Sequence, residues 1–496
     1  MSKVMHYPNF DEFKKLARQG NVVPVYRQLL ADTITPVSAF GSLGESDYSF
    51  LLESASGGEK VGRYSFLGSR PFMCFSSRRE KVTITKDGKM VETESDDPIA
   101  DLEAAVTDLK AVPIKEVPSF CCMAVGYAAY DSVRYVEYLP DEPPDDLEMP
   151  DLFFMFYDLV IVFDHLNKTL KVVAAARLDG KDPKDVYDAA LARIDAAVEQ
   201  LSKPVAVISD DIRPGGDPKL DFESNFKKND YLEAVKACKQ YIRAGDIFQV
   251  VLSQRLKTHV TADPFDIYRA ARVINPSPYM FYLRMGDANL IGASPEVMVK
   301  VEDGKVLVRP IAGTRRRGET PEDDLAMEEE LKADPKERAE HVMLVDLGRN
   351  DVGRVAEYNT VAIDEEMIVE RFSHVMHLTS QVSGRLQPGK SAFDAFRATF
   401  PAGTLSGAPK IRAMEILDEL EPTRRGPYGG AVGCIDYYGN MNTCITIRTM
   451  LLKNNTAYVQ AGGGIVADSV PEREYEETIN KAKAMFKALE TAEQGL

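Results

Sequence analysis

Alternation of apolar and polar residues is the main pattern in the first two hundred residues of the chain. Tyr157–Phe163 and Leu170–Ala175 are two such runs, with Asn167 and Lys168 between them. A period of two predicts strands joined by short turns. Beyond residue 226, predicted strands and helices mix without the regular βαβ order of a parallel sheet. The pattern therefore predicts an α+β fold.

The clearest boundary is Lys203–Phe226, which is rich in Pro, Gly and Asp and has no apolar periodicity. A chain of 496 residues also exceeds the size at which a single core keeps growing. We therefore expect an N-terminal part, 1–202, a linker-like boundary, 203–225, and a larger C-terminal part, 226–496. The acidic, Pro-rich segment Pro140–Pro150 is predicted to be a solvated loop.

The last predicted helix carries acidic residues beside an apolar stripe. Ser469 and Glu472 form a capping-box pattern around Pro471, which predicts the start of the helix. The apolar stripe consists of Tyr475, Ile479, Ala482, Phe486 and Leu489, and the neighbouring polar strip of Glu474, Glu477 and Lys481. Taken alone, this strip indicates a Glu–Lys pair on a solvated helix face.

A second acidic pair occurs in the predicted helix KERAEHVMLVDL. Glu337 and Glu340 are three residues apart, and Glu340 aligns with the apolar face of this helix. A carboxylate on an apolar face needs a partner, because burying an unpaired charge is costly. Two such helices could form an oxygen-ligand site for Mg²⁺. Ion pairs with Arg349 or Arg354 are an equally good explanation.

A hairpin is predicted for Glu296–Pro310, with its turn at Asp303-Gly304. Antiparallel pairing brings Pro310–Thr314 back near Glu296, so a carboxyl group would lie beside backbone hydrogen-bond donors. This arrangement suits a general acid. The alternative is an exposed glutamate at the end of a strand.

Two further side chains are candidates for chemistry. Arg448 follows Ile445 and Ile447 in an apolar strand-like run, where a guanidinium suits a buried carboxylate of the protein or of a substrate. His377 is by default a structural histidine. The glycine-rich segments Gly462–Ala467 and Gly403–Lys410 match neither a dinucleotide-binding unit nor a P-loop, because the chain context and the spacing are wrong.

Composition and charge exclude several classes of function. The chain has 44% hydrophobic and 28% charged residues, which is typical of globular proteins, and a formal net charge of −17. Nucleic acid and anionic membrane partners need a basic surface and are therefore not expected. The six cysteines show no CxxC pair, and the N-terminus shows no signal or transit peptide. We expect a cytoplasmic protein.

Long blocks of the C-terminal part resemble the chorismate-utilising enzymes. The blocks are NPSPYMFYL (275–283), IGASPE (291–296), PIAGTRRRG (310–318), DLGRNDVGRV (346–355), FPAGTLSGAPKIRAM (400–414) and AGGGIVADSVPEREYEETINKA (461–482). The resemblance covers nearly all of the chain from Phe226 to the end. It implies a central sandwich of two β-sheets surrounded by helices, with spatial domains that draw on separated segments of the chain.

Two positions favour the anthranilate synthases within this family. Isochorismate-forming relatives carry a lysine base where this chain has Gln249, and aminodeoxychorismate synthases typically carry a lysine in PIKGT where it has Ala312. The resemblance therefore implies a lyase that converts chorismate and ammonia to anthranilate and pyruvate, the first committed step of tryptophan biosynthesis. The alternatives are an aminodeoxychorismate synthase component I and a catalytically inactive amino-acid sensor on the same fold.

The resemblance also implies roles for individual residues. Glu296, His377 and Thr404 would be catalytic, with Glu296 as the acid for the departing hydroxyl. The Mg²⁺ cofactor would be held by Glu340 and Glu477, with Glu337 and Glu474 nearby. Substrate would be bound by Gly313, Thr314, Tyr428, Arg448, Gly462, Gly464 and Lys481.

The N-terminal LLESAS (51–56) resembles the segment with which anthranilate synthases bind tryptophan as a feedback inhibitor. The effector residues implied are Glu53, Ser54, Arg63, Pro278, Tyr279 and Met280. The chain has no glutaminase-like cysteine motif. Ammonia from glutamine would therefore come from a separate amidotransferase subunit, the anthranilate synthase component II.

Overall fold

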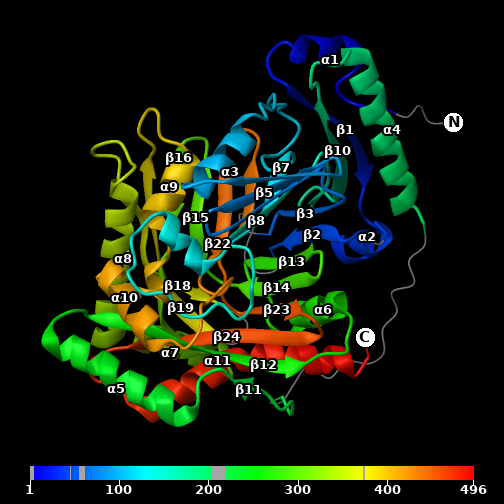
Figure 1. The fold of residues 1–496 in the computed structure, drawn as a ribbon. Helices are drawn as coiled ribbons and strands as arrows, with labels where there is room; N and C mark the ends of the chain where they lie inside the picture. Colours follow the sequence, from blue (N-terminus) through cyan, green and yellow to red (C-terminus); the bar gives the residue numbers. More distant parts are fainter. Residues whose placement is uncertain (1–4, 45, 55–61, 204–217, 373–374, 496) are drawn as a thin grey trace.

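Two large antiparallel sheets form the centre of the molecule (Figure 1). The computed structural model describes residues 5–44, 46–54, 62–203, 218–372 and 375–495. In these residues each sheet has 12 strands, and the helices lie outside the sheets. The expected α+β fold, with a two-sheet sandwich surrounded by helices, is confirmed.

The first sheet draws its strands from both halves of the chain. Its order is β1 (Val22–Leu30), β10 (Thr169–Arg177), β9 (Leu159–Asp164), β3 (Tyr64–Ser69), β2 (Tyr48–Glu53), β13 (Tyr279–Met285), β14 (Ala288–Ser294), β23 (Thr449–Lys453), β24 (Thr456–Ile465), β12 (Gln249–His259) and β11 (Glu223–Ser224), and β20 (Gly407–Ala408) pairs with β12.

The second sheet is assembled in the same way. Its order is β17 (Ile311–Arg316), β19 (Val375–Arg385), β16 (Lys305–Val308), β15 (Val297–Glu302), β22 (Met441–Ile445), β21 (Ala431–Asp436), β7 (Met123–Ala128), β8 (Leu152–Phe156), β4 (Met73–Arg78), β5 (Lys81–Lys86) and β6 (Lys89–Glu94), and β18 (Ala362–Arg371) pairs with β19. The pairs β2–β13 and β7–β21 join early strands to late ones, so the N-terminal and C-terminal parts share both sheets.

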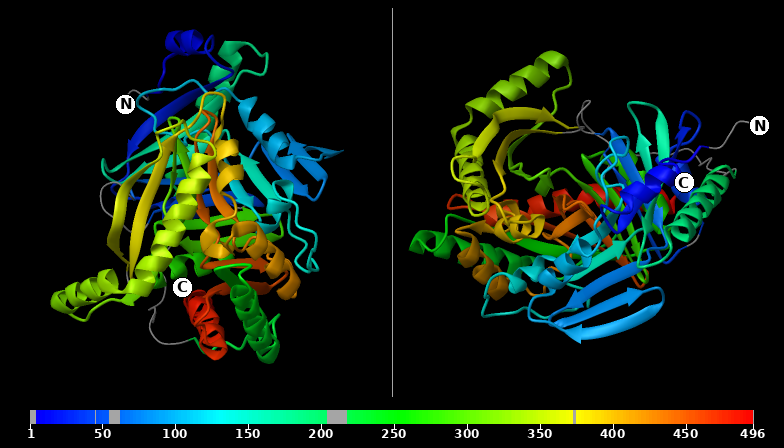
Figure 2. Two further views of the ribbon diagram at one scale, coloured as in Figure 1. Left: turned by 90° about the vertical axis from the view of Figure 1, so that its left-hand side faces the viewer. Right: turned by 90° about the horizontal axis from the view of Figure 1, so that it is seen from above.

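Helices cover the outer faces of the sheets. They are α1 (Phe10–Leu16), α2 (Pro36–Ser42), α3 (Pro98–Thr107), α4 (Pro183–Leu201), α5 (Lys228–Ala244), α6 (Pro264–Ile274), α7 (Pro321–Ala333), α8 (Pro335–Gly353), α9 (Ala392–Thr399), α10 (Lys410–Leu420) and α11 (Pro471–Glu493), with short 3₁₀ turns η1 (Tyr130–Tyr135) and η2 (Gly403–Leu405). Helix α4 lies beside β1 and β10 at one end of the molecule, and α11 lies beside β24 at the other (Figure 1). Figure 2 shows α7 and α8 at the side of the molecule, on either side of a sharp bend.

Strand β13 shows why the sequence forms two cores. Its successive residues face opposite sides of the sheet. Phe281 packs into the core between the two sheets, whereas Tyr282 packs into a second core between the first sheet and the outer helices. Phe486 of α11 lies in that second core, as its apolar stripe predicts. A strand covered on both faces must be apolar at nearly every position, and YMFYL is.

The chain crosses between the two sheets at two adjacent places. One crossing joins β14, which ends at Ser294, to β15, which begins at Val297. The other joins β22, which ends at Ile445, to β23, which begins at Thr449. The Ile445 N–H donates to the Glu296 carbonyl at 3.0 Å, so the two crossings are bonded to each other. Glu296 and Arg448 therefore lie side by side in the fold although they are far apart in the sequence.

Two local predictions need correction, and a third needs an addition. Arg448 is not in a strand: it lies in the crossing, with a φ of 50°. Helix α11 begins with Val470 as its N-cap and without a side-chain cap, so the capping box at Ser469 is wrong. The Ser469 hydroxyl instead accepts from the Val466 N–H at 3.1 Å. The segment Pro140–Pro150 is an irregular and mostly exposed loop, as predicted, but it is also anchored, because Asp145 pairs with Arg78 at 2.9 Å.

The predicted hairpin at Asp303-Gly304 is confirmed. Strands β15 and β16 pair across these two residues, and both have a positive φ, of 51° and 74°. This is the backbone twist that a two-residue hairpin needs. Among the described helices, none is both long and apolar enough to cross a membrane.

Candidate active site

Glu296 is a buried carboxyl group at the first crossing. Only 4% of its surface is exposed, so it is not the solvated strand end that the alternative required. The Thr404 hydroxyl donates to its Oε1 at 2.7 Å, and the Ile311 N–H is a second donor. Burial raises the pKa of Glu296 to about 8, although both hydrogen bonds lower it. Glu296 is therefore protonated at neutral pH and can act as an acid.

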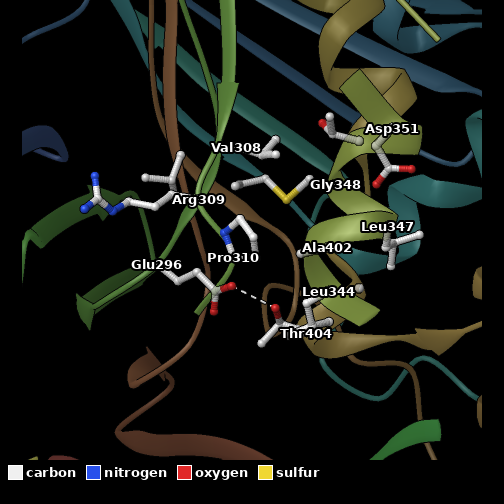
Figure 3. Close-up of a pocket in the computed structure, with 14 residues that line it drawn as sticks. Glu296, Val308, Arg309, Pro310, Leu344, Leu347, Gly348, Asp351, Ala402 and Thr404 are labelled. Carbon is white, nitrogen blue, oxygen red and sulfur yellow. Dashed lines mark hydrogen bonds between the residues drawn. The ribbon is translucent and has the colours of Figure 1, made fainter. Parts of the chain in front are cut away.

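A cavity of about 40 Å³ lies beside Glu296, between α8 and the β15–β16 hairpin (Figure 3). Glu296 and Thr404 face each other, and α8 contributes Leu344, which is drawn beside Thr404, and Leu347. The full lining is Glu296, Val297, Met298, Val308, Arg309, Pro310, Leu344, Leu347, Gly348, Asp351, Thr399, Ala402, Gly403 and Thr404. Of the predicted site residues, only Glu296 and Thr404 line this cavity.

His377 lies on β19, next to the irregular part of β17 that holds Gly313 and Thr314. Its Nδ1 is 2.9 Å from the Gly313 carbonyl and 3.1 Å from the Thr314 hydroxyl. Burial lowers the pKa of His377, and the positive charges of Arg448 and Lys481 lower it further, against the effect of the Gly313 bond. A neutral imidazole that donates from Nδ1 leaves Nε2 free to accept a proton.

Four predicted substrate residues gather on the opposite side of the site. Lys481 donates to the Gly462 carbonyl at 2.9 Å, and the Gly462 N–H donates to the Tyr428 hydroxyl. Burial lowers the pKa of Arg448, whereas Tyr428 and Glu477 raise it. In the described part of the chain, the Arg448 guanidinium has no ion pair or hydrogen bond. A partly buried, unpaired guanidinium in the same group of residues as a lysine is suited to an anionic group.

The four predicted acidic residues lie on the two expected helices. The Glu337 carboxylate of α8 reaches the backbone at Gly313, and a Cβ there would be 3.2 Å from its Oε2. The Glu474 carboxylate of α11 lies over Gly463 in the same way, at 3.2 Å. Glu477 is more exposed and pairs with Lys481 at 2.7 Å. Neighbouring charges link the helices, because Lys481 of α11 lowers the pKa of Glu340 on α8.

Neither arginine that sequence reasoning offered as a partner binds Glu340. Arg349 pairs with Asp346, and Arg354 donates to the Ala398 carbonyl. Burial and then the charge of Glu337 raise the pKa of Glu340. Within the described residues no arginine pairs with this carboxylate, and the charges of Lys336 and Lys481 offset the rise in its pKa only in part.

These carboxylates fit a hard cation. No group of three or more His, Cys, Asp and Glu side chains in the described residues is arranged to hold a metal ion by itself. Mg²⁺ does not need such a group, because it usually takes one or two carboxylates together with water and substrate oxygens. Glu340, with a raised pKa and no arginine partner, meets that requirement together with Glu477 and Glu474.

From the sequence, Gln249 indicated only that no lysine stands at this position. In the structure the residue has a role of its own. Its side chain donates a hydrogen bond to Glu340. Gly464 makes room for it, since a Cβ at that position would lie 2.5 Å from Gln249 Nε2. His341, next to Glu340, was also missed: it is fully buried and lies 2.7 Å from the Ser380 hydroxyl of β19. Its position on the apolar face of the helix was the feature of the sequence that could have identified His341 as a buried residue.

A second cavity, of about 100 Å³, lies between the sheets. Five of the six predicted effector residues line it: Glu53, Ser54, Pro278, Tyr279 and Met280. The sixth, Arg63, is not part of the lining and pairs with Asp164 at 3.0 Å. The Glu53 carboxylate is bound by Arg272 at 2.8 Å. The remaining lining comes from Leu52, Tyr64, Phe66, Phe120, Phe281, Val432, Gly433, Cys434, Asn442 and Cys444.

Known proteins place the chain in a family. The profile of the chorismate binding enzymes matches residues 49–487. The anthranilate synthase component 1 proteins of Acetivibrio thermocellus and Pseudomonas aeruginosa are both 49% identical to this chain over 98% of its length, and the matches cover 99% and 100% of those proteins.

Solved structures agree with this. The crystal structure of anthranilate synthase component I from Streptococcus pneumoniae has a TM-score of 0.78 and 39% identity, covering 92% of this chain and 99% of that one. The menaquinone-specific isochorismate synthase of Escherichia coli shares the fold, with a TM-score of 0.68 and 17% identity. The match covers 97% of this chain and 98% of that one. The chain belongs to the chorismate binding enzymes, in the family of anthranilate synthase component 1 proteins.

Proposed function

We propose that this protein is a Mg²⁺-dependent lyase that converts chorismate and ammonia to anthranilate and pyruvate. The observation that carries the proposal is the protonated Glu296, which lies on a crossing bonded to the one that bears the unpaired Arg448. A substrate that must lose a hydroxyl group and carries carboxylates needs both groups. The relatives named anthranilate synthase component 1 support the same reaction.

Glu296 supplies the proton in the first step. Ammonia adds at C2 of the ring while the C4 hydroxyl takes the proton and leaves as water. The ammonium adduct then loses a proton, which restores the acid. In the second step the proton on C2 of the ring passes to Nε2 of the neutral His377 while the C–O bond to the enolpyruvyl group breaks. The departing enolate takes up a proton to become pyruvate, and the ring becomes aromatic.

The cationic side of the site orients the substrate. Arg448 binds the enolpyruvyl carboxylate, with the Tyr428 hydroxyl and the Gly462 and Gly464 backbone beside it. Lys481, fixed to the Gly462 carbonyl at 2.9 Å, adds a second positive charge. Gly313 and Thr314, beside His377, complete the polar lining.

Glu340 and Glu477 would hold Mg²⁺, with Glu337 and Glu474 close by. The ion would bind the ring carboxylate and offset its charge. Its presence would also relieve the repulsion between Glu337 and Glu340, which contributes to the raised pKa of Glu340.

Tryptophan is proposed to bind the cavity between the sheets and to inhibit the reaction. Inhibition requires that tryptophan favour a state with a misaligned catalytic site. Strands β13 and β22 both line this cavity, and β22 leads directly into the crossing that carries Arg448. A separate glutamine amidotransferase subunit would supply ammonia.

Product identity separates this proposal from its alternatives. Chorismate, Mg²⁺ and ammonium should yield fluorescent anthranilate, detected by its emission and by chromatography. An accumulating 4-amino product would indicate an aminodeoxychorismate synthase. Tryptophan binding without any consumption of chorismate would indicate an inactive sensor.

The catalytic acid should be visible in the pH dependence. Activity requires protonated Glu296, so kcat/KM at equal free ammonia should fall as pH rises through about 8. Thr404→Val removes a hydrogen bond that lowers this pKa, and the alkaline limb should move to higher pH. Glu296→Gln should reduce kcat by roughly 10²–10⁴-fold. An unchanged limb in Thr404→Val would assign it to another group.

The proposed metal ligand has a matched control on the same helix. Glu477→Gln should raise the Mg²⁺ concentration needed for half-maximal activity by about tenfold or more, with little change in the thermal midpoint. Glu476→Gln alters an exposed glutamate one position away and should leave both quantities unchanged. Equal Mg²⁺ dependence of the two variants would remove Glu477 from the metal site.

The effector site can be tested without disturbing catalysis. The buried Ser54 hydroxyl has no hydrogen-bond partner within the described residues, so a ligand can supply one. Ser54→Ala should raise the tryptophan concentration for half inhibition by about tenfold and leave uninhibited turnover close to wild type. Ser202→Ala, at the end of α4, is the control. Undiminished inhibition in Ser54→Ala would place the effector elsewhere.

A further inference from the structure

Arg425 is a buried cation behind the candidate active site. Only 3% of its surface is exposed, and its ion-pair partner Glu421 is 6% exposed. Two nearly inaccessible charges in one place are costly to bury unless each is fully paired. Their arrangement therefore needs an explanation.

The pair is fully bonded to its surroundings. Arg425 donates from Nε and Nη2 to the two oxygens of Glu421, at 2.8 and 2.7 Å. Glu421 also accepts from the backbone and the hydroxyl of Ser253 on β12, both at 2.8 Å. Burial lowers the pKa of Arg425, but the Glu421 carboxylate outweighs it and the net pKa is raised. The guanidinium is thus a fixed charge.

The remaining donors of Arg425 reach two segments that carry site residues. Nη1 donates to the Leu405 carbonyl at 2.6 Å, and Leu405 follows Thr404, the donor to Glu296. Nη2 donates to the Val251 carbonyl at 2.7 Å. Val251 is paired with Gly464 and its side chain borders Gly462, so this bond fixes the strand beside the predicted carboxylate clamp.

The plane of the guanidinium is covered by two aromatic rings. Its central carbon lies 4.5 Å from the ring centre of Tyr130 and 5.7 Å from that of Tyr428. Such stacking favours arginine over lysine, because lysine has neither the flat surface nor the forked donors. Tyr428 is the residue whose hydroxyl accepts from Gly462.

We propose that Arg425 is a positioning residue that holds the acid side and the carboxylate side of the active site at a fixed separation. One planar group binds the segment of Thr404, the strand beside Gly462 and the ring of Tyr428. A lysine could make one of these three contacts but not all of them. The inference rests on the proposed function, since it assigns Thr404 and Tyr428 their roles.

Arg424 provides a matched control. It is the neighbouring residue, is 5% exposed and is also paired with buried carboxylates, Asp131 at 3.1 Å and Asp151 at 2.5 Å. Its guanidinium contacts η1 and the segment before β8 and none of the predicted site residues. Arg424→Lys and Arg425→Lys should both lower the thermal midpoint.

The two variants should differ in catalysis. Arg425→Lys should reduce kcat/KM for chorismate about 100-fold, weaken chorismate binding measured by calorimetry without ammonium, and move the alkaline limb of the pH profile upward as Thr404→Val does. Arg424→Lys should keep the wild-type pH limb and chorismate affinity. Glu421→Gln loosens the guanidinium without removing it, so it should also weaken chorismate binding and move the alkaline limb upward. This variant tests the inference if Arg425→Lys does not fold.

Two outcomes contradict the inference. Equal losses of kcat/KM in the two arginine variants would make Arg425 a purely structural residue. An unmoved pH limb together with unchanged chorismate affinity in Arg425→Lys or Glu421→Gln would do the same. Failure of the proposed function is distinct, because then the wild-type protein itself forms no anthranilate.

Discussion

The two bonded crossings between the sheets are the constraint on which the site depends. At each crossing the chain leaves one sheet and enters the other, so its backbone cannot continue either ladder of hydrogen bonds. The Ile445 N–H and the Glu296 carbonyl satisfy each other across this gap, and Ala293 N–H does the same with the Arg448 carbonyl. Glu296 and Arg448 are thereby held on two adjacent crossings, and no ion pair joins them in the described residues.

Keeping Glu296 and Arg448 apart gives the site its chemistry. If the two paired, the pKa of Glu296 would fall and the acid would be lost. Instead Glu296 faces the Thr404 hydroxyl and the Ile311 N–H, two neutral donors that leave it protonated near neutral pH. Arg448 keeps its charge for an anionic ligand. The acidic helices α8 and α11 add carboxylates at a third side of the site. There, burial and the negative charge of Glu337 raise the pKa of Glu340.

The effector cavity and the catalytic site are built from the same strands. The cavity between the sheets is lined by β2 and β13 of one sheet and by β21 and β22 of the other. The hairpin partner of β13, β14, ends at the crossing with Glu296, and β22 ends at the crossing with Arg448. A ligand that changed the spacing of the sheets at the cavity would change the separation of these two residues. The geometry thus offers a short physical connection between regulation and catalysis.

The sequence alone determined the elements and the chemical inventory. The period of two along the early strands, the apolar stripe of α11 and the hairpin turn at Asp303-Gly304 all act through contacts close in sequence, so they were predictable. The hairpin and the apolar run around Ile445 made Glu296 and Arg448 candidates, and the family resemblance added a catalytic role for His377. Only the tertiary structure decided that Arg448 leaves its strand, that Gln249 binds Glu340, and that Arg425 lies between Thr404 and Tyr428. Each of these depends on how separate elements of the fold pack against one another, and local propensity carries no information about that packing.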